Sequence, residues 1–508
     1  MTVKSRDFLL NSVYNEFLIK KDTIKDQNDL GLSKNNSDNW ENLFNSQIYF
    51  NNRDYSKSKE NALKILENST NESNLLVAEA YNILGRIARL YKLDEDANAF
   101  YNSSINNFKK ERSFYGDFGV IRLEFNQANI LLLASELSKA SKAYDELLNK
   151  INTLIADNEL QNELDKLKLK LNQNKALTLL YQAKVPESKE FFEKALSYIS
   201  SVSGTSTEAD LYLNYSNLTI VQEDFKLTYS LLSKAGQLYK NLDRNDLFSK
   251  IEIDKIKINL IEEIDQAIDP LFASNLISLY DQAKKGKDVN LRIVEIFELI
   301  YSKGRFDEAN ELKDYLLQHD FLPDLRGRIL FVSMNLLLQE NKYEEVFSMG
   351  KEILDITKVL KDEESILPIN ILLTKAKYML KKNSTELLNS LKSYTSQLLK
   401  LKDVTSAITV YEEYFPILFD QDKFTVIIEI LEQVEGLVLK KFKDENVKEY
   451  HEHDLILIFA LTKQEKAKKL YSSRKQSFEQ IKEVSRFKTI LSQNNQIETE
   501  IKEFLQVA

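Results

Sequence analysis

The residues with the widest chemical repertoire in this sequence are three histidines, two of which lie in the segment His451-Glu-His-Asp454. Metal ligation from a helix needs two histidines on one face, at positions i and i+4. His451 and His453 are only two residues apart, which places them about 200° apart around a helix. We therefore interpret this segment as a solvated helix start. The third histidine, His319, is expected to make a favourable contact with the C-terminus of a helix.

Other arrangements that carry out catalysis are missing from the sequence. The chain has no cysteine, so a nucleophile and its base have almost no candidates. The segments Ser302-Lys-Gly-Arg305 and Lys284-Lys-Gly-Lys287 have single glycines without the spacing of a phosphate-binding loop. The 78 acidic residues lie on segments with amphipathic helical patterns, where carboxylates are typical of the solvated face. The sequence therefore predicts no enzyme and no catalytic, cofactor-binding or metal-ligating residue.

The composition indicates that helices must position any binding residues. Only 11 glycines and 5 prolines occur in 508 residues, so β-turns have few of the residues that favour them. The net charge of −9, with both signs interleaved, disfavours direct binding of nucleic acid. The first 16 residues contain no apolar stretch long enough for a signal peptide or a membrane span. We expect a cytoplasmic protein, or a nuclear one if the source is eukaryotic.

One spacing recurs along the first half of the chain. In the segment Tyr81-Asn-Ile-Leu-Gly85, Gly85 is followed twelve residues later by Ala97, and Tyr101 and Ser104 continue the same helix face. A small residue at both positions would let two antiparallel helices approach closely. The same step joins Ser46 to Ser58, Ala128 to Ala140, Ala176 to Ser188 and Ser216 to Thr228. The spacing predicts five stacked helical hairpins.

Tyr81, Leu84, Gly85, Ala97, Tyr101 and Ser104 resemble the signature of the tetratricopeptide (TPR) family. Four of the five repeats lack the glycine, and none has the proline that commonly closes the second helix. The resemblance implies an all-α, right-handed superhelical solenoid of antiparallel helical hairpins, divergent in the C-terminal half. We expect an N-terminal capping helix and loop over residues 1–36, five TPR-like repeats over 37–245, bridging helices over 246–292, four divergent hairpins over 293–445 and C-terminal capping helices over 446–508. The divergent hairpins are expected from Phe297 to Ala309, Met334 to Val346, Ala376 to Leu388 and Tyr414 to Val426.

In that family the first helix of each hairpin lines a concave groove, so the resemblance implies which residues face a ligand. They are Asn82, Arg86, Arg89, Arg122, Phe125, Asn129, Lys170, Gln173 and Asn217. A guanidinium can hold a carboxylate by two hydrogen bonds, and a side-chain amide can hold a peptide backbone. Two alternatives to ligand binding stay open. In the first, Arg86, Arg89 and Arg122 are solvated or paired with acids such as Glu79 and Glu124. In the second, Trp40 does not anchor a ligand but packs under the N-terminal cap.

These residues predict a protein–protein interaction scaffold or adaptor that binds a partner protein or an extended peptide in the groove. The ligand is expected to have an acidic segment or a free C-terminus. The alternatives are a peptide- or ligand-sensing regulator of the helical-repeat type and a structural subunit of a large complex. No cofactor is expected. Replacing Arg86 and Arg122 by glutamate should weaken partner binding and leave the melting temperature nearly unchanged, because exposed charges contribute little to folding.

Overall fold

The computed structural model describes residues 3–22, 24, 38–67, 72–262, 271–283, 286–363, 365–400, 423–436, 445–462 and 465–481, together with residues 406, 407, 410, 415, 418, 499, 503 and 504. In these residues every regular element is helical, so the predicted all-α class is confirmed. None of these helices combines the length and the apolarity that crossing a membrane requires. The chain divides into two compact units, Met1–Ile293 and Val294–Ala508.

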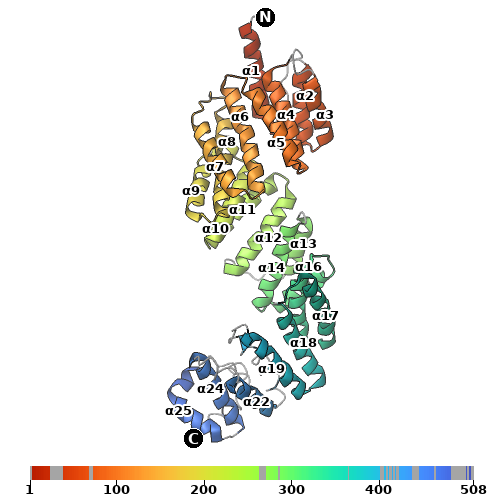
Figure 1. The fold of residues 1–508 in the computed structure, drawn as a ribbon, viewed down its shortest axis with the longest axis vertical. Helices are drawn as coiled ribbons and strands as arrows, with labels where there is room; N and C mark the ends of the chain where they lie inside the picture. The colour runs from red at the N-terminus through yellow and green to blue at the C-terminus, as the bar shows by residue number, and fades with distance from the viewer. Residues whose placement is uncertain are drawn as a thin grey trace. The chain divides into compact units, whose positions relative to one another are not determined.

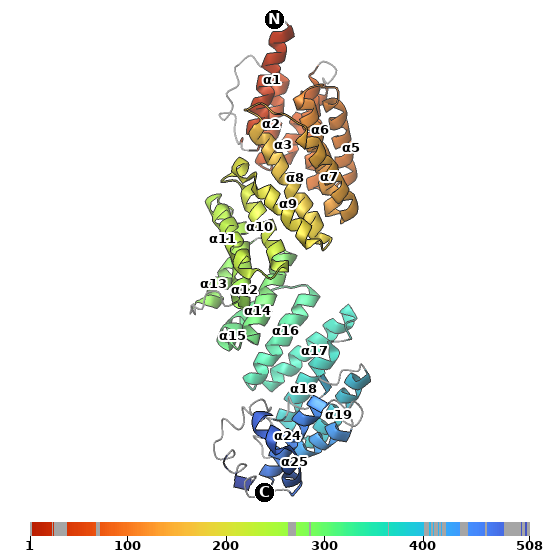
Figure 2. The ribbon, with the colours of Figure 1, turned by 90° about the vertical axis from the view of Figure 1, so that its left-hand side faces the viewer.

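The N-terminal unit contains α1 (Val3–Lys20), α2 (Asp38–Asn51), α3 (Tyr55–Glu67), α4 (Asn74–Leu90), α5 (Asp94–Phe108), α6 (Phe114–Leu133), α7 (Leu137–Asn152), α8 (Gln161–Tyr181), α9 (Val185–Leu196), a short 3₁₀ helix η3 (Ile199–Val202), α10 (Ser206–Val221), α11 (Phe225–Asn241), α12 (Asn245–Glu262) and α13 (Phe272–Gln282). Helices α2 to α11 pack as five successive pairs, α2 with α3 through α10 with α11 (Figures 1 and 2). The five predicted hairpins are therefore confirmed, and the unit is an all-α solenoid.

The small residues that predicted the hairpins lie where paired helices touch. A Cβ atom on Gly85 would lie 2.5 Å from Cε1 of Tyr101, so the missing side chain is what admits the Tyr101 ring. In the first hairpin, Ser46 Oγ donates to Ser58 O at 2.7 Å and Ser58 Oγ donates to Ser46 O at 2.8 Å. Small side chains thus bring the helices close and the serines also satisfy their own buried hydroxyls.

The turn inside each hairpin repeats one backbone geometry. Arg53, Lys92, Ser135, Ala183 and Glu223 each follow a first helix and each have φ between 57° and 63°. The next amide donates back to the helix, as Lys184 N does to Leu179 O at 2.9 Å, which satisfies a carbonyl that the helix end leaves open. None of the five is a glycine, although a left-handed conformation costs other residues about 1–2 kcal/mol.

Replacing Ala183 with glycine is expected to stabilise the protein by about 0.5–1 kcal/mol, because glycine adopts φ of 58° without strain. The gain is partly offset by the greater freedom of glycine in the unfolded chain. Lys189→Gly, at an exposed position inside α9, is the matched control and should destabilise by about 1 kcal/mol. Urea unfolding followed by circular dichroism measures both. A destabilised Ala183→Gly variant would contradict the account of the turn.

The C-terminal unit continues from within α14 (Lys287–Ser302) through α15 (Phe306–Leu317), α16 (Pro323–Gln339), α17 (Tyr343–Leu360), α18 (Ile366–Lys381), α19 (Ser384–Lys400), α22 (Phe424–Val434), α24 (Glu445–Leu461) and α25 (Glu465–Ile481). Gly304 (φ 72°) follows α14, as expected for a helix C-terminus. Met334 and Val346 are fully buried in the paired helices α16 and α17, and Ala376 and Leu388 lie on α18 and α19, which contact each other. Of the fourth expected hairpin, Tyr414 lies outside the described residues.

The histidines differ in how well they were predicted. His319 Nδ1 lies 2.9 Å from the carbonyl oxygen of Tyr315 near the end of α15, which confirms the expected contact with a helix C-terminus. The interpretation of His451 as part of a solvated helix start is wrong, because α24 begins six residues earlier, at Glu445, and His451 is only 3% exposed. The described residues contain no group of three or more acidic or histidine side chains that could hold a metal ion.

Candidate ligand-binding face

Helices α2, α4, α6, α8 and α10, the first helices of the five hairpins, form one continuous surface, which we call the first-helix face. Each contacts the next first helix directly, whereas successive second helices make no comparable contact among the described residues. Elements on the inside of a curved stack lie closer together than those on the outside. The first-helix face is therefore the concave side of the hairpin stack.

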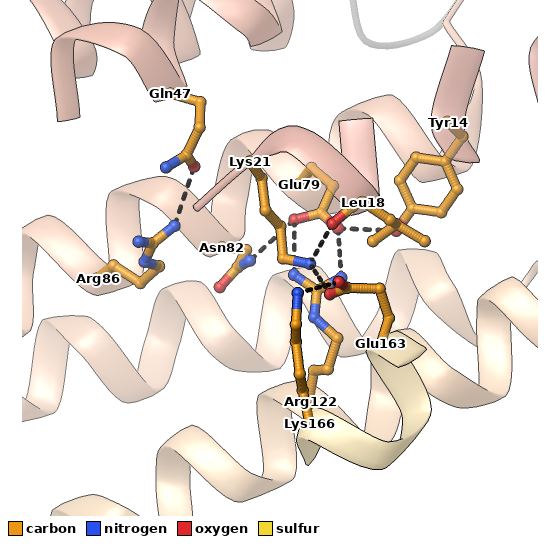
Figure 3. A network of polar contacts seen from close by, with 10 residues as sticks. All are labelled: Tyr14, Leu18, Lys21, Gln47, Glu79, Asn82, Arg86, Arg122, Glu163 and Lys166. Carbon is orange, nitrogen blue, oxygen red and sulfur yellow. Dashed lines mark hydrogen bonds and ion pairs between the residues drawn. The ribbon is translucent and has the colours of Figure 1, made fainter. Parts of the chain in front are cut away.

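Helix α1 lies on this face, where it and the residue after it contact α2, α4, α6 and α8. Figure 3 shows the contacts with α4 and α8. The Phe17 ring meets Phe44 of α2 with 5.5 Å between ring centroids, and Tyr14 meets Tyr115 of α6 at the same separation. The Tyr14 hydroxyl donates to Glu79 Oε1 of α4 at 2.7 Å. Just beyond α1, Lys21 Nζ binds Glu163 Oε2 of α8 at 3.2 Å.

A buried ion pair lies beneath α1. Arg122 Nη1 of α6 binds Glu79 Oε1 of α4 at 2.7 Å, and Asn82 Nδ2 donates to Glu79 Oε2 at 2.8 Å. Burial alone would raise the pKa of the Glu79 carboxyl, but the charge of Arg122 and the hydrogen bonds from Arg122, Asn82 and Tyr14 outweigh it and hold that pKa below its usual value. Burial, followed by the neighbouring Glu79 charge, raises the pKa of the Tyr14 hydroxyl. Both Glu79 and Arg122 are thus fixed in their charged forms.

The chain just after α1 brings a carboxylate among the cations of the face. Asp22 keeps an exposed surface. Its partial burial would raise the pKa of the carboxyl, but the charges of Lys21, Lys170, Arg86 and Arg122 outweigh that effect and lower the pKa. Arg86 itself donates from Nη1 to Gln47 Oε1 at 3.0 Å. An acidic group therefore already occupies part of the basic surface.

The predicted groove residues all lie on first helices, and the structure divides them by environment. Arg122, Phe125, Asn129, Asn82 and Gln173 are buried or nearly so, Arg86, Arg89 and Lys170 are half-buried, and Asn217 is exposed. Asn129 Oδ1 accepts hydrogen bonds from Tyr144 Oη and Asn174 Nδ2, both at 2.7 Å. The side chains of four of these residues make no hydrogen bond or ion pair with any described residue, namely Arg89, Lys170, Gln173 and Asn217. These four side chains are the ones with binding capacity left over.

Two of the open alternatives are resolved by these contacts. Arg122 is paired with Glu79, and its side chain is only 13% exposed, so treating it as an exposed charge was wrong. Glu124 instead pairs with Lys150 at 2.6 Å. Trp40 is 4% exposed, with its ring centroid 6.3 Å from that of Tyr14, so it packs under the N-terminal helix.

Sequence reasoning missed the contribution of α1 to this face. Its signal was present, because Tyr14, Phe17 and Leu18 have the i, i+3, i+4 spacing of an apolar helix stripe. That stripe showed that α1 must pack against something, but it did not show on which surface.

No protein-family model matches the sequence, and no curated protein is significantly similar to it. Among solved structures, the apo form of RapI is 12% identical, with a TM-score of 0.40 over 54% of this chain and 95% of that one. A Rap protein complexed with competence and sporulation factor is 14% identical, with a TM-score of 0.40 over 71% of this chain and 99% of that one. The TPR domain of P58(IPK) is 13% identical, with a TM-score of 0.21 over 75% and 99%. No residue of the first-helix face is assigned from these likenesses.

The fold of the N-terminal unit is a stack of antiparallel helical hairpins. Its paired helices, the twelve-residue step between small residues and the direct contacts between successive first helices are the geometry that the TPR resemblance implied.

Proposed function

We propose that this protein is an interaction scaffold or adaptor that binds a segment of a partner protein on the first-helix face. The observation that carries the proposal is the set of unused polar side chains there. Four polar side chains on first helices have no hydrogen-bond or ion-pair partner among the described residues. They are the guanidinium of Arg89, the ammonium of Lys170 and the amides of Gln173 and Asn217.

The charges of this face favour an acidic ligand. Glu79 is neutralised by Arg122, and Glu163 binds both Lys21 and Lys166. Arg89 and Lys170 remain as cations without a paired acid in the described part of the chain. A carboxylate of a bound peptide would meet charge-assisted hydrogen-bond donors there, and the free amides suit a peptide backbone. A peptide segment with an acidic side chain or a free C-terminus satisfies both.

A regulator that senses a peptide is the second candidate, and the position of α1 favours it over a permanent structural subunit. A permanent subunit would keep its binding face open for assembly, whereas here a helix of the same chain already covers part of that face.

The double variant Arg89→Glu/Lys170→Glu tests the proposal. An acidic peptide selected from a library of short peptides against the wild-type chain should bind this variant at least about tenfold more weakly, because two favourable charge contacts become repulsive. Fluorescence polarisation measures the affinity. The control Lys139→Glu/Lys142→Glu makes the same charge change on the second helix α7, where the two side chains are 73% and 81% exposed, and should bind like the wild type. Failure to select any acidic peptide, or equal affinity in all three proteins, would contradict the proposal.

A further inference from the structure

We propose that α1 is a displaceable internal ligand of the first-helix face, and that the partner segment which replaces it is an amphipathic helix with an apolar stripe followed by an acidic residue. This inference rests on the proposed function and adds both the class of ligand and its regulation. Its basis is the set of contacts that α1 and Lys21, the residue after it, make with the face; those of Tyr14 and Lys21 are drawn in Figure 3.

Helix α1 is seated on the face as a bound helix would be. Over residues 12–20, where the side chains of α1 are described, one side is buried, with Tyr14, Phe17 and Leu18 each no more than 1% exposed, while Ile19 on the other side is 45% exposed. The buried stripe crosses successive hairpins instead of pairing with one second helix. This is the mode in which an amphipathic helix lies in a groove, with anchors at i, i+3 and i+4.

The hairpin stack does not depend on α1 for its own pairings. Helix α2 packs against α3 and α4, and α3 packs against α4. The first hairpin is therefore joined to the second through its own two helices. Departure of α1 would uncover the face without unpairing a hairpin.

The polar groups that α1 contacts keep partners within the face when α1 leaves. Glu79 keeps Arg122 and Asn82, and Glu163 keeps Lys166 at 2.6 Å. Asn51, which donates to the carbonyl oxygens of Lys21 and Ile24, keeps a hydrogen bond from Gln47. No charge would be left buried and unpaired, which is the outcome that makes removal of a polar partner costly.

The apolar side chains of the face that lie against α1 define which kind of segment can replace it. Trp40, Phe44 and Tyr115 pack against the α1 stripe, and they would be exposed if α1 left an empty face. An incoming segment must therefore bring its own apolar stripe. Asp22 lies four residues beyond Leu18 and directly follows Lys21, which binds Glu163 of α8, so it marks the place of a carboxylate beyond the end of that stripe.

The single tryptophan makes the exchange measurable in the full-length chain. Trp40 is the only tryptophan of the protein and lies under α1, so its quenching by acrylamide reports whether the face is covered. The probe is a fluorescein-labelled synthetic peptide with the sequence of residues 3–24. The variant Phe17→Ala/Leu18→Ala loosens α1 within the chain, and Ile19→Ala on the exposed side of α1 is the matched control.

The loosened variant is expected to show greater quenching of Trp40 and to bind the peptide at least about tenfold more tightly than the wild type, because the internal competitor is weakened. Bound peptide should restore the protection of Trp40, and a peptide with Asp22→Lys should bind more weakly. The control should match the wild type. A loosened variant that exposes Trp40 but binds no peptide would overturn the inference.

Hydrogen–deuterium exchange of the wild-type chain tests the inference independently, in case the loosened variant fails to fold. Amides of α1 should exchange at least about tenfold faster than those of α4 and α6, since a displaceable helix opens more often than the stack. Equal protection would overturn the inference. If an acidic library peptide binds through Arg89 and Lys170 while α1 stays protected, the scaffold function stands and only the internal-ligand inference falls.

Discussion

Replacing Gly85 with leucine is expected to destabilise the N-terminal unit by about 3 kcal/mol or more, because the two helices of its hairpin touch at this position. Even a Cβ atom at this position would lie 2.5 Å from Cε1 and 2.6 Å from Cδ1 of Tyr101. The Tyr101 ring is fully buried, so it has no free space to enter. The two helices of the hairpin would have to separate. Thermal and urea unfolding measure the loss.

A smaller substitution at two glycines separates this contact from helix propensity. Gly85→Ala should destabilise, because the new methyl group still overlaps Tyr101. Gly327→Ala, also inside a first helix, should stabilise by up to about 1 kcal/mol, because its Cβ would lie 3.7 Å from Ile356 Cγ2, an ordinary contact distance. If both alanines changed the stability in the same direction, the close approach at Gly85 would not be what holds the hairpin together.

Replacing Arg122 with alanine is expected to cost about 3–5 kcal/mol, because it leaves the Glu79 carboxylate buried without its counter-ion. Glu79 is 1% exposed and would keep only the hydrogen bonds from Asn82 and Tyr14. The double variant Glu79→Ala/Arg122→Ala should recover much of that loss, since no unpaired charge remains. Lys150→Ala breaks the exposed pair with Glu124 between α6 and α7 and should cost less than about 1 kcal/mol.

The same ion pair gives a pH dependence with a definite sign. Because the pKa of Glu79 is lower in the folded protein than in the unfolded chain, its stabilisation is present above the unfolded-state pKa and is lost as the pH falls through the folded-state pKa. Glu79→Gln should therefore flatten the acid limb of the stability curve measured by urea unfolding.

An Arg122→Ala variant as stable as Lys150→Ala would show that the pair between Arg122 and Glu79 is not buried as described.

The hairpins could be predicted because the information that specifies them is local. Gly85 and Ala97 are twelve residues apart, and their side chains must fit one interface between neighbouring helices. The repeat register also placed the candidate groove residues on first helices.

The environment of those residues could not be predicted, because it depends on partners far away in the sequence. Arg122 and Glu79 are 43 residues apart, and Tyr14 is 65 residues from Glu79. A glutamate on an amphipathic helix is expected to be solvated unless the sequence also shows which helix covers it. His451 fails in the same way, since the segment His451-Glu-His-Asp454 does not reveal that α24 starts earlier and is buried there.

Hydrogen–deuterium exchange of the full-length chain, with and without the selected acidic peptide, tests the central claim most directly. The account predicts slower exchange on binding around Arg89 in the last turn of α4, around Lys170 in the middle of α8 and in the intervening first helix α6, and no change in the second helices α5, α7 and α9. Protection confined to the second helices, or to the C-terminal unit, would contradict the assignment of the first-helix face as the binding surface.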